Sequence, residues 1–476
     1  MGLPLPSSIP RAIDDAAFYQ DPLRFFAKSR SRLGDIFVIR ETGPIFSRAP
    51  ECTGVIGVFG ARYNRAVLSN LDQFVMPMSA SKRLSLPPKL VNLNFAVHSM
   101  RGEQHAQHAR ILMRALSERN IEDQYVSIAA GLEEFAAGWR LGASLALLGE
   151  MRQLALRISS RMLFGDQYGD VRQLESGLQK YFHLRREVVS SLRTTTQRSR
   201  RDLIELGTAV DSALRRYIRW CRTLAPTTSD GILAKLARIE LEDGKPLSEN
   251  QLVAHGNVLF MSANEPIAVS LTWILLILSQ LPRLRRILRH ELDRISDTGG
   301  VPHAKDFARL PLLDSVIKES LRLLPPNALM VRVTRRSALF DGMQLPELCE
   351  LVLCPFLAHR DPALFPNPKD FLPARWTDMK PSPFEYFPFG AGGHHCLGQH
   401  LAMYVIKAAL AFIARRYEVV LSEDQEVDWQ IQIIFMPRNE PMMILKPPRT
   451  SGAHKGGKLR GPISDLISLD ARELSY

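Results

Sequence analysis

One cysteine of the chain lies in a setting that could hold a metal cofactor. Cys396 ends a loop that contains Gly390, Gly392 and Gly393, and a helical pattern begins directly after it at Leu397. Glycine lets a backbone approach a flat ligand closely or take positive φ values. A thiol at a helix N-terminus is shifted toward the thiolate by backbone N–H groups and the helix dipole. Such a thiolate is a good axial ligand for haem iron. The alternative is a glycine loop with an incidental buried cysteine.

The loop resembles the haem-binding signature of the cytochrome P-450 family, Phe-x-x-Gly-x-(Arg or His)-x-Cys-x-Gly. The matching residues are Phe389, Gly392, His394, Cys396 and Gly398. The resemblance implies haem b as the cofactor, with Cys396 as the ligand of the iron and His394 against a haem propionate. It also implies a mainly α-helical fold with a small β-rich region, in one large domain.

Three charged residues match a second feature of the family. Glu319 and Arg322 lie one turn apart on a helix expected over residues 313–324, and Arg375 lies in a later Pro-x-Arg element. An isolated Glu-x-x-Arg pair is usually an exposed ion pair worth about 0.5 kcal/mol or less. The resemblance instead implies that the three residues form a buried cluster, which supports the haem-side core and takes no part in the chemistry.

Other basic residues are candidates to bind the haem propionates. Arg332 lies where many members of the family place a propionate-binding arginine, and an arginine fork suits a carboxylate. The alternative for Arg332 is a surface arginine. His105 and Arg110 belong to a stretch that resembles the helix supplying further propionate contacts. We expect His108, between them, to be a solvated helix residue.

The helix expected over residues 251–281 departs from the family where it should cross the distal face of the haem. The family pattern (Ala/Gly)-Gly-x-(Asp/Glu)-Thr aligns with Ser262-Ala263-Asn264-Glu265-Pro266. The acid is kept as Glu265, but Pro266 replaces the threonine that steers protons in ordinary members. Proline has neither hydroxyl nor N–H, and it frees the carbonyl of Ser262. Ser262, Ala263, Glu265 and Pro266 are the candidate catalytic-site residues.

Three interpretations of this departure are open. Water or a substrate hydroxyl replaces the lost group in a monooxygenase. Alternatively, O₂ activation is bypassed, as in members that rearrange or dehydrate peroxides or use peroxide directly. In the third, the alignment of this helix is displaced.

Composition and periodicity indicate the organisation of the chain. Its 476 residues, 46% of them apolar, can bury a large core. The helical period dominates residues 103–295, and short strand patterns occupy residues 35–39 and 54–59. We expect an N-terminal segment over 1–30, the haem domain over 31–447 and a flexible basic tail over 448–476. The five cysteines are odd in number and form no CxxC pair, which argues against a disulfide framework or a zinc site. Three or four of them are therefore expected to be small buried residues.

Charge and hydropathy bear on the partners. The net charge of +12 is spread along helical segments, which favours acidic partners but not nucleic acid. No run approaches the roughly 20 apolar residues of a membrane span, and no signal-peptide pattern is present. We therefore expect a cytoplasmic monomer without a membrane anchor.

No flavin or iron–sulfur motif is present, so electrons from NAD(P)H would arrive through a ferredoxin or flavodoxin with its reductase. The candidate docking residues for this donor are Lys407, Arg415 and Arg416. The basic stretch 181–201 is expected to cover the substrate entrance. It is either a solvated face or the docking place of an anionic substrate or carrier.

These features favour a haem-thiolate monooxygenase. It would activate O₂ reductively and insert oxygen, typically as a hydroxyl group, into a small organic substrate. The alternative is a haem-thiolate peroxide isomerase, dehydratase or peroxygenase that needs no redox partner. A third, less favoured hypothesis is a non-catalytic haem-binding protein.

Overall fold

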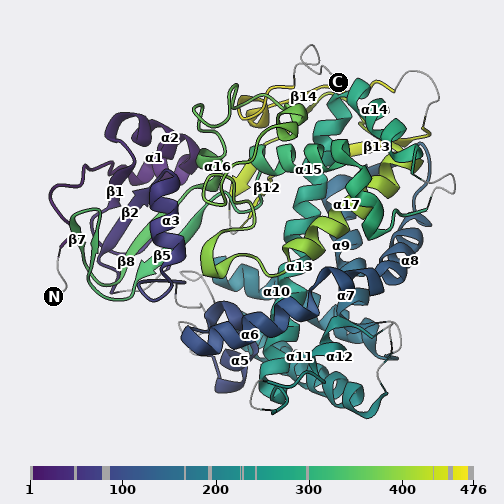
Figure 1. The fold of residues 1–476 in the computed structure, drawn as a ribbon, viewed down its shortest axis with the longest axis horizontal. Helices are drawn as coiled ribbons and strands as arrows, with labels where there is room; N and C mark the ends of the chain where they lie inside the picture. Colours follow the sequence, from purple (N-terminus) through teal and green to yellow (C-terminus); the bar gives the residue numbers. More distant parts are fainter. Residues whose placement is uncertain are drawn as a thin grey trace. The chain divides into compact units, whose positions relative to one another are not determined.

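The computed structural model is mainly helical with several small sheets (Figure 1), as predicted from the sequence. It describes residues 4–47, 51–77, 86–165, 168–190, 196–225, 227, 230–241, 244–295, 300–431, 434–448 and 454–469. The backbone groups into two compact units. Unit 1 takes in Met1–Ser79, Arg322–Lys369 and Met379–Cys396, and unit 2 takes in Ala80–Leu321, Asp370–Asp378 and Leu397–Tyr476.

Unit 1 is built on a five-stranded sheet. Its strand order is β1 (Ile36–Arg40), β2 (Gly54–Val58), β8 (Cys349–Leu353), β5 (Met330–Thr334) and β3 (Phe74–Val75). The pairing of β2 with β8 is parallel and the others are antiparallel. Every residue of β2 and β8 is buried, as expected for central strands covered on both faces. The other elements of the unit are α1 (Asp15–Gln20), α2 (Pro22–Leu33), α3 (Ala61–Ser69), α16 (Pro355–Ala358), β6 (Ala338–Phe340), β7 (Met343–Leu345) and η4 (Gly392–His394).

Unit 2 holds most of the helices. They are α5 (Pro88–Leu93), α6 (Gly102–Ala115), α7 (Glu118–Asp123), α8 (Tyr125–Ala136), α9 (Leu147–Phe164), α10 (Val171–Ser190), α11 (Gln197–Thr223), α12 (Ile232–Leu236), α13 (Glu249–Gln280), α14 (Pro282–Asp293), α15 (Pro311–Leu323) and α17 (Gln399–Arg416), with the 3-10 turns η1 (Val97–Ser99), η2 (Ala304–Arg309), η3 (Pro373–Thr377) and η5 (Pro462–Asp465). Small sheets join β4 (Ser144–Ala146), β13 (Met442–Lys446) and β9 (Glu418–Leu421), β11 (Trp429–Ile431) and β12 (Phe435–Pro437), and β10 (Gln425–Glu426) and β14 (Leu459–Arg460).

The long helix α13 forms the core of unit 2. It packs against α9, α11 and α17, and Ser248 and Gln251 start it with a reciprocal capping box. Among the described residues, α13 is the one helix that is long and apolar enough to cross a membrane, although most of that apolar stretch is buried inside the protein. This apolar stretch is not an uninterrupted apolar run of the kind that a membrane span was expected to need. Hydroxyl residues interrupt the apolar run, but Ser270 and Thr272 satisfy their hydroxyls on the carbonyl oxygens one turn earlier.

Part of the segment predicted to be a mobile tail is packed. β14 pairs with β10, and Ile463 and Ile467 are buried. A Cβ atom at Gly457 would lie 1.9 Å from the backbone of Glu423, so this glycine allows a close chain contact. Residues 454–469 are therefore held against the rest of unit 2, in contrast to the flexible tail expected over 448–476.

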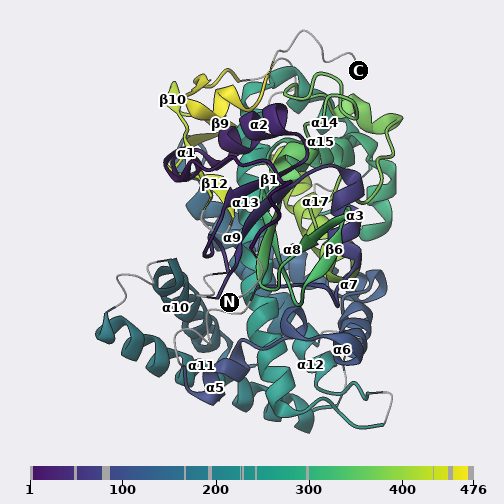
Figure 2. The same cartoon turned by 90° about the vertical axis from the view of Figure 1, so that its left-hand side faces the viewer.

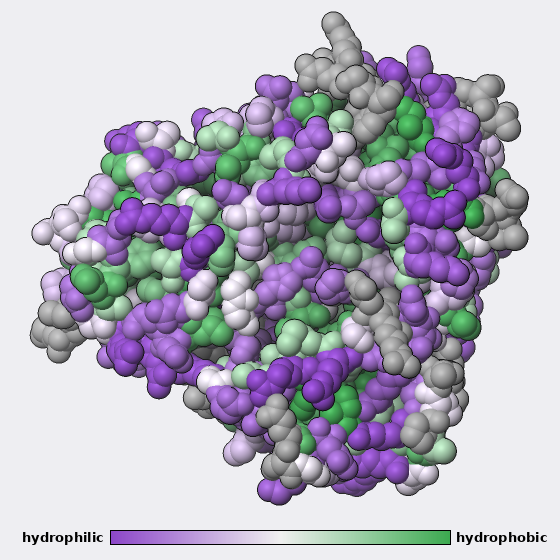
Figure 3. Space-filling view, viewed as in Figure 1, coloured by the Kyte–Doolittle hydropathy of each residue, from purple (hydrophilic) through white to green (hydrophobic). Residues whose placement is uncertain are grey.

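The visible surface mixes hydrophilic and hydrophobic residues (Figure 3). The large exposed apolar side chains are scattered along the described sequence: Ile13, Tyr19, Phe95, Met113, Val126, Leu141, Leu339 and Met442. Isolated apolar residues are normal on a protein surface.

Candidate functional site

The loop before Cys396 is held by its own backbone. The Cys396 N–H donates to the carbonyl oxygen of Phe389 at 2.9 Å, and the Gly390 N–H donates to that of Phe387 at 2.9 Å. Cys396 is exposed, whereas Cys52, Cys221, Cys349 and Cys354 are buried, as expected for small apolar residues. Helix α17 begins at Gln399, three residues after Cys396, and Gly398 is its N-cap with φ −90°. The loop therefore presents one accessible thiol directly ahead of a helix.

Glycine is required at one position of this loop, and the space is tight at the next. Gly392 has φ +69°, and a Cβ atom there would lie 2.0 Å from the carbonyl oxygen of Leu68 at the end of α3. A Cβ atom at Gly393 would lie 2.4 Å from the Leu71 side chain. The signature glycine Gly392 thus lets the loop pack directly on backbone, and the turn η4 leads from it to His394, two residues later.

Arg332 is a buried cation suited to an anionic ligand. It lies on β5 with 2% of its surface exposed, so it is not the surface arginine considered as the alternative. Its Nη1 donates to the carbonyl oxygen of Val331 at 2.9 Å. Its Nε is buried without a hydrogen-bond partner among the described residues. Burial lowers the pKa of Arg332 to about 10. A buried donor without a partner is costly, so this residue fits the predicted role of binding a haem propionate.

The structure separates the two predicted propionate ligands of α6. His105 is buried and burial lowers its pKa, whereas Arg110 pairs with Glu103 of the same helix at 3.1 Å and has 42% of its side chain exposed. Five residues on a helix correspond to a rotation of roughly 140°. His105 and Arg110 therefore lie on different faces, and the geometry favours His105 alone for the cofactor.

The prediction that His108 is solvated was wrong. His108 is 2% exposed, its Nδ1 lies 2.8 Å from Nε2 of His255 on α13, and its Nε2 lies 3.2 Å from the amide nitrogen of Gln251. The pKa of His255 is lowered to about 3, mainly by burial and to a smaller extent by the nearby His108 and His98. Sequence reasoning missed this pair because the two residues are far apart in the chain, although His255 was a visible polar residue in an apolar helix.

The distal segment of α13 has an acid that is already paired. Glu265 is buried and accepts two hydrogen bonds from Nε of Arg152 on α9, both at 3.1 Å, and Nη2 of Arg152 also donates to it. Arg186 on α10 lies 3.5 Å from the same carboxylate. Pro266 lies inside the helix, Ser262 is exposed and Ala263 is half-buried. The four candidate catalytic-site residues thus lie on one stretch of α13, with the carboxylate fixed by two arginines.

The three residues of the predicted charged cluster are all buried or nearly so. Glu319 is fully buried and accepts hydrogen bonds at 2.9 Å from Nε of Arg375, the indole nitrogen of Trp376 and the backbone N–H of Leu372. Arg322 is also fully buried, and its Nη1 donates to the carbonyl oxygens of His359 at 2.9 Å and Pro368 at 2.8 Å. These bonds connect separate chain segments, which agrees with the structural role predicted for all three charged residues.

The basic residues proposed for donor docking have partners of their own. Lys407 pairs with Asp314 at 2.6 Å, and Arg416 pairs with Glu133 at 2.5 Å. The Arg415 side chain is 6% exposed and donates to the carbonyl oxygen of Gly300 at 3.1 Å. The three cations are therefore already neutralised or buried, and the structure does not favour them as a docking surface.

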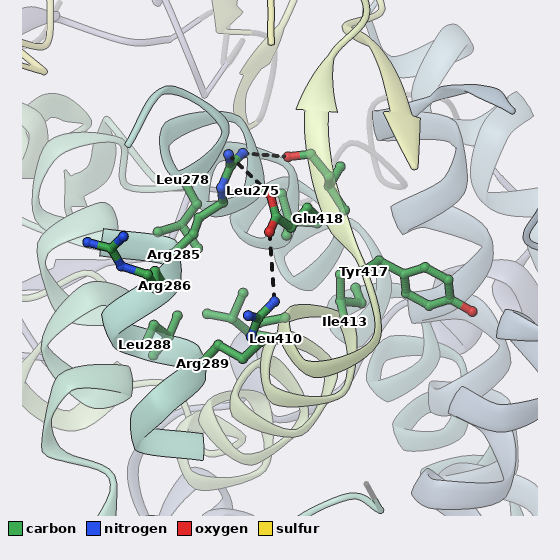
Figure 4. Close-up of a pocket in the computed structure, with 12 residues that line it drawn as sticks. Leu275, Leu278, Arg285, Arg286, Leu288, Arg289, Leu410, Ile413, Tyr417 and Glu418 are labelled. Atoms are coloured by element: carbon green, nitrogen blue, oxygen red, sulfur yellow. Dashed lines mark hydrogen bonds and ion pairs between the residues drawn. The ribbon is translucent and has the colours of Figure 1, made fainter. Parts of the chain in front are cut away.

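A small pocket on unit 2 shows the same kind of internal neutralisation (Figure 4). Its buried Glu418 lies 3.7 Å from both Arg285 and Arg289, and Nη1 of Arg285 donates to the carbonyl oxygen of Val419. The pocket contains none of the predicted site residues. Its arginines anchor β9 to α14 and are not candidates for chemistry.

Comparisons with known proteins identify the fold and the family. The chain is 26% identical over 433 residues to cyclooctat-9-en-7-ol 5-monooxygenase of Streptomyces melanosporofaciens, covering 87% of this chain and 88% of that protein. It is 34% identical over 200 residues to the mitochondrial sterol 26-hydroxylase of Rattus norvegicus, covering 40% of this chain and 38% of that protein. The structure of retinoic acid-bound cyanobacterial CYP120A1 superposes with a TM-score of 0.78 at 21% identity, over 93% of this chain and 100% of that chain. A family model for cytochrome P450 matches residues 36–445. The chain therefore belongs to the cytochrome P450 family and is a haem-thiolate monooxygenase.

Proposed function

We propose that this enzyme inserts one atom of O₂ into a small organic substrate, with electrons from NAD(P)H supplied by a ferredoxin or flavodoxin and its reductase. The observation that carries the proposal is the loop of Cys396, where the one exposed cysteine of the chain follows the glycine that allows close packing on α3. The cytoplasmic, monomeric state expected from the sequence stays a prediction.

The residues fit haem b, although they belong to separate parts of the chain. Bound haem supplies the redox chemistry of O₂ activation, for which protein groups provide the ligand, the orientation and the protons. Cys396 would ligate the iron as a thiolate. His394, Arg332 and His105 would hold the propionates, and the unsatisfied Nε of Arg332 is the clearest sign of an anionic partner. Phe389 fixes the loop through its carbonyl oxygen, and Gly398 starts α17.

Proton delivery in this enzyme cannot use a side-chain hydroxyl at Pro266. Proline has no N–H, so the carbonyl oxygen of Ser262 has no helical donor at this position. Ser262 is exposed, so a water molecule can bind to that carbonyl and to the Ser262 hydroxyl. Glu265 is held by Arg152 and Arg186, so it orients this stretch of α13 and is not a freely rotating carboxylate. We infer that water at Ser262 replaces the missing threonine.

The same observations favour one second candidate function. A distal segment without a hydroxyl at Pro266, and with its acid locked in ion pairs, also suits an enzyme that rearranges, dehydrates or consumes peroxides. Such an enzyme would need no electron donor.

Oxygen consumption separates the two functions. The purified haem protein is supplied with a ferredoxin, its reductase and NADPH, and substrate-dependent O₂ uptake is followed for compounds that shift the haem spectrum. The monooxygenase is expected to take up O₂ and form product in step with NADPH oxidation. Turnover of hydroperoxides without reductant, with no O₂ uptake for any binding compound, would refute the monooxygenase function and support the peroxide function.

A further inference from the structure

Helix α10 carries a half-buried arginine, Arg185, that pairs with no acid among the described residues. Tyr181 and Arg185 are four residues apart and share one face of this helix. The Tyr181 hydroxyl accepts a hydrogen bond from the Asn94 amide at 2.9 Å, and the charge of Arg185 acts on His98 of η1. Helix α10 packs along α11 (Figure 2), and the bond from Asn94 to Tyr181 joins it to the residue that follows α5.

Arg185 and His98 are surrounded by protein and are also reached by solvent. Burial lowers the pKa of Arg185, and burial together with Arg185 lowers the pKa of His98 to about 4. Yet the His98 side chain is exposed and that of Arg185 is half-buried. Groups that are surrounded by protein and still reachable by solvent lie in a concave place. The neighbouring Phe95 is 40% exposed, so this place also offers apolar surface.

The charges in this part of the protein do not balance. Arg152 and Arg186 share the single carboxylate of Glu265. No acid in the described part of the chain forms an ion pair with Arg185. Glu187 is exposed, and residues 189–195, which follow it, contain no acid in the sequence. Burying a cation without a partner is costly, and a guanidinium binds a carboxylate with two parallel hydrogen bonds.

We propose that Arg185 binds a carboxylate group of the substrate and that the enzyme therefore acts on an organic acid with an apolar body; this rests on the monooxygenase function proposed above. Arg185 directly precedes Arg186, whose guanidinium contacts Glu265 in the distal segment of α13. A carboxylate held at Arg185 would orient the apolar part of the substrate relative to this segment. Arg185 is thus a specificity-determining residue.

The test compares matched ligands on the haem-loaded enzyme. Straight-chain fatty acids from eight to sixteen carbons and their methyl esters are titrated while the haem absorption is recorded. The wild type is expected to bind the best acid at least about tenfold more tightly than its ester, the equivalent of about 1.4 kcal/mol. Arg185→Gln should remove this preference and leave ester binding within about twofold, and Arg185→Lys should restore part of it. Arg172→Gln, an exposed arginine on the same helix, is the control and should change neither.

Three results would overturn the proposal. One is equal weakening of acid and ester in Arg185→Gln. Another is the absence of any spectral shift with every acid in the wild type. The third is loss of haem from Arg185→Gln, which would assign Arg185 to the cofactor. Failure of the monooxygenase function can be distinguished from failure of the Arg185 proposal. In the former case the acid would still bind in preference to its ester, but no O₂ uptake would occur with the redox partner.

Discussion

Removal of the Glu319 carboxylate should destabilise the protein more than any surface change on the same helix. Glu319 is fully buried, and Arg375, Trp376 and Leu372 each donate to it at 2.9 Å. In Glu319→Ala the Arg375 guanidinium, with 7% of its side chain exposed, loses its buried partner. Breaking a buried ion pair by removing one member costs about 3–5 kcal/mol. The two N–H donors left without an acceptor each add a cost of about 1–3 kcal/mol, so we expect a loss of at least about 5 kcal/mol.

The assay is urea unfolding followed by far-UV circular dichroism, with haem release followed in parallel by absorption. Lys318→Ala is the control, because Lys318 pairs with Asp314 on the same helix at 2.7 Å but has 39% of its side chain exposed. It should cost less than about 1 kcal/mol. Glu319→Gln keeps the shape and one acceptor but leaves Arg375 uncompensated, so it should fall between the two. If Glu319→Ala unfolded at the same urea concentration as Lys318→Ala, or were stable and haem-loaded but inactive, the structural role would be refuted.

The remaining predictions concern other parts of the chain. The pKa of His255 is lowered to about 3 in the folded state. As the pH falls below about 6.5, the His255 imidazole is therefore protonated in the unfolded chain but stays neutral in the folded protein. The free energy of unfolding should therefore fall by about 2 kcal/mol between pH 7 and pH 5 through this residue, and a His255→Gln variant with the same slope in a pH series of urea curves would contradict this. Gly392→Ala should abolish soluble haem protein because its Cβ would collide with the Leu68 carbonyl, while Gly43→Ala, also at positive φ but with no atom within 4 Å, should yield folded protein; equal yields would exclude the steric argument. Pro266→Thr should leave the product formed per NADPH oxidised unchanged, since water at Ser262 already takes the place of the missing hydroxyl, and a clear rise in this ratio would contradict that role of water.

Local patterns predicted the elements that carry the site. The helices expected over 251–281 and 313–324 are α13 and α15 within a few residues, and the helix expected to begin at Leu397 is α17, because their apolar periodicity and caps are local. The loop of Cys396 was recognisable because close packing permits only glycine at Gly392. These features depend on neighbouring residues, which one sequence displays directly.

Contacts between distant segments could not be predicted. The pairing of Glu265 with Arg152 and Arg186 joins three helices, and no spacing in the sequence indicates it. The same holds for His108 with His255. The basic residues Lys407 and Arg416 looked available for a partner because their acids, Asp314 and Glu133, lie far away in the sequence.

The central claim is that Cys396 is the thiolate ligand of haem, and the absorption spectrum of the reduced carbon monoxide complex tests it most directly. Wild-type protein should show the red-shifted Soret band of a thiolate-ligated haem. Cys52→Ser, which can keep the hydrogen bond from this position to the Gly54 carbonyl, should show the same band. Cys396→Ser should lose it while remaining folded. A Cys396→Ser protein that kept the band unchanged would contradict the assignment and, with it, the monooxygenase function.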